Sequence, residues 1–212
     1  MNPPARFLSV ATLGVWLACP ASAGAHRLDE YLQATRVSID VDRVGLEIDL
    51  TPGVSVAPQV LASIDTNGDG QISASEGEAY ARQMIGSVSL LVDGRPEPVT
   101  LVEHRFPDVR DARLGVGTIR LRATAKLSAT TVGRHQVSYL NAHRPQGSVY
   151  LVNALVPENT RIRIADQQRD QAQHGLTVNY RVRPWTPGWL LAGLAMVGAL
   201  VVTRKPRSNS AT

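Results

Sequence analysis

Sulfur and aromatic side chains are scarce in this sequence. It has one cysteine, Cys19, and only two phenylalanines, three tryptophans and five tyrosines in 212 residues. A single thiol excludes an intrachain disulfide and a cysteine-rich metal site. The few aromatic residues offer no platform for stacking bases, and the net charge of +4 arises from scattered basic residues. Nucleic-acid binding is therefore not predicted.

Motifs for catalysis are also missing. The five histidines are dispersed, and none is spaced from another as the two ligands of a helical zinc site are. The sequence has no Gly-x-Ser-x-Gly nucleophile motif. Gly115-Val116-Gly117 lacks the third glycine and the following helix of a dinucleotide-binding turn. We therefore predict that the protein is not an enzyme and has no catalytic residues.

The first 25 residues have the features of a secretory signal peptide. Arg6 supplies a positive charge, and residues 7–18 form the apolar region. Two small-x-small cleavage patterns follow at 21–23 and 23–25, and cleavage at either would also remove Cys19. An uncleaved membrane anchor is the alternative interpretation.

A second apolar segment lies near the other end of the chain. Residues 187–202 are almost all apolar, and no charged residue occurs between Arg183 and Arg204. Trp185 and Trp189 stand at its leading edge, as interfacial aromatic residues do. These features predict a single-pass membrane protein with an extracytoplasmic domain (periplasmic or extracellular) at 26–184, a transmembrane helix at 185–203 and a cytoplasmic tail at 204–212.

Between these segments the sequence alternates polar and apolar residues with a period of two. The first two such runs, 35–41 and 43–50, predict a hairpin that turns around Asp42. Further strands are predicted at 87–92, 99–106, 117–125, 135–141, 148–155, 160–165 and 176–182. Short strands at regular spacing predict a mainly β fold, an antiparallel β-sandwich. Its predicted core positions are Ile39, Val41, Leu46, Ile48, Leu90, Ile119, Leu121, Val137, Tyr139, Val149 and Leu151.

Residues 65–76 read Asp-Thr-Asn-Gly-Asp-Gly-Gln-Ile-Ser-Ala-Ser-Glu. Oxygen-bearing side chains stand at positions 1, 3, 5, 9 and 12 of this run, with glycine at position 6 and an aliphatic residue at position 8. Ca²⁺ is a hard cation that takes about six to eight oxygen ligands, and this spacing supplies them. The predicted ligands are Asp65, Asn67, Asp69, the backbone carbonyl of Gln71, Ser73 and Glu76.

A simpler interpretation of the same residues needs no ion. Aspartate, asparagine and glycine are ordinary turn formers. Ser73 and Glu76 also have the spacing of a capping box, which would start a helix after the turn.

The 65–76 run closely resembles the calcium loop of the EF-hand family. The resemblance implies a helix–loop–helix inserted in the sandwich at 56–85, with Ca²⁺ as the bound ion. EF-hands usually pair through position 8, here Ile72, and the sequence contains no second loop of this type. A solitary hand implies a structural or weak-sensing role, with a Kd of about 10⁻⁴–10⁻³ M.

Residues 25–32, Ala-His-Arg-Leu-Asp-Glu-Tyr-Leu, are similar to the start of periplasmic domains that precede nickel/cobalt permeases of the hydrogenase/urease accessory type. This similarity implies an alternative function as an accessory or interaction subunit of a membrane transport or metal-handling system, with a protein partner in the membrane. If cleavage follows Ala25, the amine and imidazole of His26 could together bind Cu(II).

Overall fold

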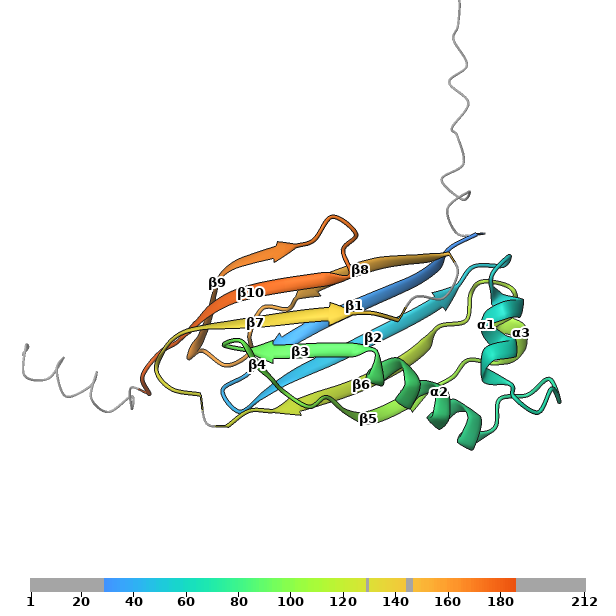
Figure 1. The fold of residues 1–212 in the computed structure, drawn as a ribbon, viewed down its shortest axis with the longest axis horizontal. Helices are drawn as coiled ribbons and strands as arrows, with labels where there is room; N and C mark the ends of the chain where they lie inside the picture. The colour runs from blue at the N-terminus through green and yellow to red at the C-terminus, as the bar shows by residue number, and fades with distance from the viewer. Residues whose placement is uncertain (1–28, 129, 144–146, 186–212) are drawn as a thin grey trace, which may run out of the picture.

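The computed structural model describes residues 29–128, 130–143 and 147–185. In this part of the chain two five-stranded sheets pack face to face, so the prediction of a mainly β fold is confirmed (Figure 1). The described residues include no helix long and apolar enough to cross a membrane. The predicted signal peptide, residues 186–203 of the predicted transmembrane helix and the predicted tail lie outside the described residues.

The two sheets draw their strands from along the whole chain. The first sheet has the order β5-β6-β2-β1-β8, and its strands are β1 (Tyr31–Ile39), β2 (Arg43–Pro52), β5 (Thr100–Arg105), β6 (Ile119–Lys126) and β8 (Ser148–Ala154). The second has the order β4-β3-β7-β10-β9, and its strands are β3 (Val88–Val92), β4 (Arg95–Pro96), β7 (Gly133–Asn141), β9 (Ile162–Arg169) and β10 (Gly175–Val182). Every predicted strand is present, whereas the short β4 was not predicted.

The sheets are antiparallel except at one pair of strands. β8 lies parallel to β1, with Tyr31 opposite Ser148 and Val37 opposite Ala154. The chain reaches β8 from β7 in the other sheet, so it re-enters the first sheet without a hairpin. The outer edge of β8 is covered by side chains of β9, because Arg169 Nε donates to the Val152 carbonyl at 2.6 Å. Such covering protects an edge strand from pairing with another chain.

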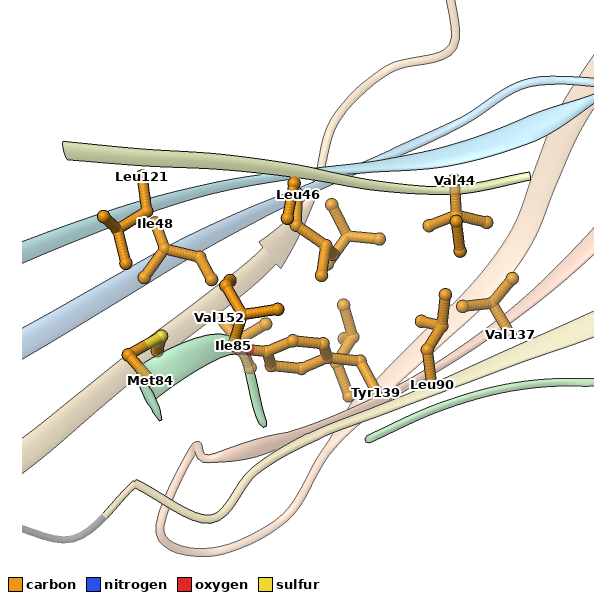
Figure 2. Packing of buried hydrophobic residues seen from close by; sticks show 14 of the residues in the cluster. Val44, Leu46, Ile48, Met84, Ile85, Leu90, Leu121, Val137, Tyr139 and Val152 are labelled. Carbon is orange, nitrogen blue, oxygen red and sulfur yellow. The ribbon is translucent and has the colours of Figure 1, made fainter. Parts of the chain in front are cut away.

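The core lies between the sheets, where inward side chains of both meet (Figure 2). Leu46 and Ile48 of β2 face Leu90 and Tyr139 of the second sheet, and all four are at most 3 % exposed. Most predicted core positions are confirmed. The exceptions are Val41, which is half-buried, and Val149 and Leu151, which are 38 % and 42 % exposed because β8 turns Val152 inward instead.

Three helices gather at one end of the sandwich, which we call the helical end (Figure 1). They are α1 (Ala57–Ile64), α2 (Ala74–Gly86) and the unpredicted α3 (Val109–Arg113). α1 and α2 carry the chain from β2 in the first sheet to β3 in the second. β10 starts at the helical end and runs away from it, so Trp185 lies at the opposite end, which we call the exit end.

Candidate metal site

The twelve residues 65–76, here called the acidic loop, connect α1 to α2. α1 buries Val60, Leu61 and Ile64 against the domain, and Asp65 caps its end through a backbone hydrogen bond to Leu61. α2 begins at Ala74, so the last three residues of the acidic loop form its first turn. The two helices thereby fix both ends of the loop on the core.

The carboxylate of Asp65 organises the first half of the acidic loop. Its Oδ1 accepts from the backbone N–H groups of Gly68 at 2.8 Å and Asp69 at 3.1 Å, and its Oδ2 accepts from Gly70 N–H at 2.8 Å. Gly68 and Gly70 have φ of +73° and +79°, which residues with a Cβ rarely adopt. Gly70, at position 6, therefore allows the sharp turn that a calcium loop of this type makes there.

The next two predicted ligands are tied to each other. Asn67 Oδ1 accepts from Asp69 N–H at 2.9 Å, and Asn67 Nδ2 donates to Asp69 Oδ2 at 3.1 Å. Asp69 Oδ1 in turn accepts from the N–H of Gln71 at 2.8 Å. The side chain of Gln71 is exposed, consistent with a position that would contribute only its carbonyl.

The carboxylate of Glu76 bridges the two ends of the acidic loop. Its Oε1 accepts from the backbone N–H groups of Thr66 at 2.9 Å and Asn67 at 3.2 Å. Its Oε2 accepts from the hydroxyl of Ser73 at 2.7 Å and from Ser73 N–H at 3.0 Å, while Glu76 N–H donates back to Ser73 Oγ. The capping box predicted from the sequence is thus present.

These hydrogen bonds favour the charged form of Glu76. The side-chain bond from Ser73 contributes most, followed by the backbone bond from Ser73, and together with those from Asn67 and Thr66 they lower the pKa of Glu76 to about 2. Glu76 is also only 8 % exposed. A buried carboxylate that stays ionised at neutral pH is suited to bind a cation.

The chemistry of the acidic loop suits one class of metal. All its side-chain donors are oxygens, which hard cations such as Ca²⁺ prefer, and it contains no imidazole or thiolate for zinc or copper. Among the described residues no three Asp, Glu, His or Cys side chains gather into a group that could hold a metal ion. The carboxylates of Asp65 and Glu76 now accept hydrogen bonds from backbone N–H groups. To bind one ion together, they would give up some of these hydrogen bonds and coordinate the ion instead. His26, the other predicted metal ligand, lies outside the described residues.

The segment between β5 and β6 packs beside the acidic loop. A cavity of about 590 Å³ lies between Gly70–Ile72 and the stretch from Phe106 to Leu114. A second cavity, of about 410 Å³, separates Asp65 and Ile72 from Val109 and Arg113 of α3. Ile72, for which the sequence offers no partner loop, therefore borders the same cavity as α3.

A buried hydrogen-bond network, which we call the Tyr80 network, continues from α2 into the sandwich. Tyr80 lies one helical turn after Glu76, and its hydroxyl is 2.8 Å from Tyr31 OH and 3.2 Å from His143 Nε2. The Gln33 side chain donates to the His143 carbonyl and accepts from the Asn141 amide. Burial lowers the pKa of His143, so the neutral imidazole is favoured as the acceptor for Tyr80.

The Tyr80 network was not predicted from the sequence. One signal was available, since Gln33 and Thr35 share the inward alternation of β1 with Tyr31, Val37 and Ile39. Polar residues in the inward phase of a strand indicate buried hydrogen bonds. Their partners Tyr139, Asn141 and His143 are more than a hundred residues away, so the sequence does not identify them.

No protein-family model matches the chain, and a search of curated proteins finds no significant relative. The fold and the acidic loop therefore define the protein only as a mainly β domain with a carboxylate-rich helix–loop–helix at one end.

Proposed function

We propose that the acidic loop is an EF-hand-like site that binds Ca²⁺, and that the protein is a membrane-anchored extracytoplasmic calcium-binding protein. The observation that carries this proposal is the placement of the Glu76 side chain, which belongs to position 12 of the loop. Its carboxylate is buried, ionised and directed toward Thr66 and Asn67 at the start of the loop. A capping box alone requires only the bonds with Ser73, whereas the bonds across the loop bring the final ligand to the first ones.

The proposed ligands divide into two groups by their attachment. Asp65 follows directly on α1, and Ser73 and Glu76 belong to the start of α2. Asn67, Asp69 and the carbonyl of Gln71 lie on the turn between them. Bound Ca²⁺ would neutralise part of the charge of the three carboxylates and tie the two helices together. An ion that binds only the folded state stabilises it by RT ln(1 + [L]/Kd).

The setting of the acidic loop supports a structural or weak-sensing role. The loop lies at the helical end, whereas the chain leaves the domain toward the predicted transmembrane segment at the exit end. The proposed calcium site is thus far from the membrane. Ile72 lines a cavity together with Val109 and Arg113 of α3, and the described residues contain no second calcium loop that could couple two ions.

Calorimetric titration with Ca²⁺ tests the proposal. We expect one site with a Kd of about 10⁻⁴–10⁻³ M, the range of extracellular modules. Glu76→Gln is the informative variant, because glutamine keeps the capping box but removes the charge and a strong oxygen ligand. Binding should be lost in Glu76→Gln and retained in Glu78→Gln, which changes an exposed neighbour on the same helix. Titrations that coincide for the two variants would remove Glu76 from the site.

A further inference from the structure

Three arginines form a row across the second sheet. Arg181 of β10 stands directly opposite Arg134 of β7 on one side and Arg163 of β9 on the other. The neighbours of Arg181 along β10, Tyr180 and Val182, point into the core, so Arg181 points outward. Directly paired residues share one face of a sheet, with Cβ atoms about 4.5–5.5 Å apart. We call these three exposed residues the arginine row.

Within the described part of the chain, no acidic side chain forms an ion pair with the arginine row. None of the ion pairs among the described residues involves Arg134, Arg163 or Arg181. Like charges placed directly opposite each other destabilise a sheet. In the first sheet Arg105 also lies opposite Arg120, but there Glu103 forms ion pairs with Arg105 and Arg122 that offset the repulsion. Folding therefore gives no reason for the arginine row, whereas an external polyanion would.

The position of the arginine row indicates which polyanion. The row lies at the exit end of the sandwich. Arg181 is four residues before Trp185, whose side chain is 71 % exposed. The loops of this end also expose Val132 and Val156, at 57 % and 89 %. Basic residues beside exposed apolar and tryptophan side chains are the composition of a surface that contacts a bilayer. The sequence after Trp185 continues into the apolar stretch 187–202.

The loops around the arginine row carry acidic residues as well. Asp40 and Asp42 lie in the turn between β1 and β2, but Asp40 is 3.8 Å from Arg43, which offsets its charge. The same end carries Glu158 together with two further arginines, Arg161 and Arg183, and the Arg161 guanidinium donates to the Arg183 carbonyl. The exit end therefore remains basic. The helical end, with the acidic loop, is its opposite in charge.

We propose that the arginine row binds phosphate groups of anionic phospholipids and holds the exit end against the membrane. Guanidinium groups bind phosphate in a bidentate manner, which suits a row of adjacent headgroups. The inference rests on the membrane placement in the proposed function. It adds an orientation, in which the second sheet meets the lipid surface and the acidic loop is directed away from it.

Fluorescence quenching of the full chain in lipid nanodiscs tests the contact. A fluorophore is attached at Thr160→Cys, at the exit end, in a Cys19→Ser background, and the lipids carry a nitroxide quencher in their headgroups. We expect strong quenching when the phosphatidylcholine bilayer contains phosphatidylglycerol, and weaker quenching without it. The same fluorophore at Ser75→Cys, at the helical end, should remain unquenched in both bilayers.

Charge variants assign the contact to the arginine row. The triple variant Arg134→Gln/Arg163→Gln/Arg181→Gln should lower the contact equilibrium on the order of 100-fold, because each basic residue near an anionic surface contributes roughly fivefold. The matched control is Arg105→Gln/Arg120→Gln/Arg122→Gln, which removes three exposed charges from the first sheet. It should leave the quenching unchanged.

Each remaining outcome has a defined meaning. Absence of quenching at Thr160→Cys, or equal quenching in the row variant and its control, overturns the proposal. Chemical cross-linking in membranes gives a further outcome. If an acidic protein is cross-linked to the unmodified chain but not to the row variant, while lipid quenching is unchanged, the arginine row binds a protein and the proposal is overturned. Release of the chain by alkaline carbonate refutes the membrane anchor instead. In that case, binding of the released chain to preformed phosphatidylglycerol vesicles tests the lipid contact separately. Weaker vesicle binding by the row variant supports the proposed lipid contact. Equal binding by the row variant and the unmodified chain overturns it.

Discussion

The hydroxyl oxygens of Tyr31 and Tyr80 lie 2.8 Å apart in the interior of the domain. Both side chains are at most 4 % exposed, and they belong to β1 and α2. Each hydroxyl needs a partner here, because a buried polar group without one is costly. The contact thus fixes the rotation of α2 about its axis, and with it the direction in which Glu76 points, one turn earlier.

Removing the Tyr80 hydroxyl should therefore destabilise the domain. Tyr80→Phe deprives both Tyr31 OH and His143 Nε2 of a buried partner, and we expect a loss of about 1–3 kcal/mol in the free energy of unfolding. Urea denaturation measures it. Tyr150→Phe is the control, because the His143 carbonyl it bonds also accepts from Gln33 and remains paired. A smaller loss in Tyr80→Phe than in the control would contradict the prediction.

The close packing of α2 on Phe106 leads to a second prediction. A Cβ at Gly77 would lie 3.0 Å from two ring atoms of Phe106, whereas a Cβ at Gly86 of the same helix would meet nothing within 4 Å. We expect Gly77→Ala to cost about 1–3 kcal/mol through overpacking. Gly86→Ala should stabilise by about 0.4–1 kcal/mol, because it restricts the unfolded chain. Thermal unfolding of the two variants, with shifts of opposite sign, measures the difference.

The same glycine illustrates the limit of local sequence patterns at a helix end. A glycine after the last apolar positions of a helix, here Met84 and Ile85, commonly ends it in a left-handed conformation. The structure differs, since α2 includes Gly86 and ends with Ser87 as its cap. The start of the helix was predictable because a capping box involves residues three apart in sequence. The end of α2 depends on how the chain turns into β3, and this turn is set by the packing of β3 in the second sheet.

Strand positions were readable from the sequence, but the partner of a strand was not. β1 and β2 alternate strictly, so their inward residues are evident. β8 contains Val149, Leu151 and Val152, an almost continuous apolar run that fits either face. Its parallel pairing with β1 depends on the path from the other sheet. The candidate ligands are close together in sequence, so they could be predicted without knowing how the chain folds over longer distances. The packing of α3 beside them depends on that long-range fold and could not be predicted.

Two histidines with opposite environments predict the pH dependence of stability. His135 is bonded through Nδ1 to Asp93 Oδ2 at 2.7 Å and through Nε2 to the Thr131 carbonyl at 2.8 Å. Burial lowers its pKa, but these acceptors outweigh burial and raise the pKa above 6.5. Its contribution to stability should be complete below pH 6.5 and lost as pH rises through the folded-state pKa. In urea denaturation across this range, His135→Gln should remove that loss.

His143 should have the opposite effect on the acidic side. Burial lowers its pKa in the folded state below 6.5, so the unfolded state takes up a proton first as pH falls. Stability should decline below pH 6.5 until the folded-state pKa is reached, and His143→Gln should remove this decline. If both histidine variants changed the profile on the same side of pH 6.5, the two assignments would be wrong.

Glu76 should govern part of the acid unfolding of the domain even when Ca²⁺ is absent. Its pKa is lowered from 4.5 to about 2, mainly by the Ser73 side chain. The stabilisation from its ionised form is present above pH 4.5 and is lost as pH falls toward 2. Acid titration in a chelator, followed by circular dichroism, should give a shallower decline for Glu76→Gln than for the unmodified protein. Glu158→Gln changes the same charge at an exposed position far from the acidic loop and is the control. Since glutamine preserves the capping box, an equally steep decline in Glu76→Gln would show that the carboxylate is not held by the acidic loop in solution.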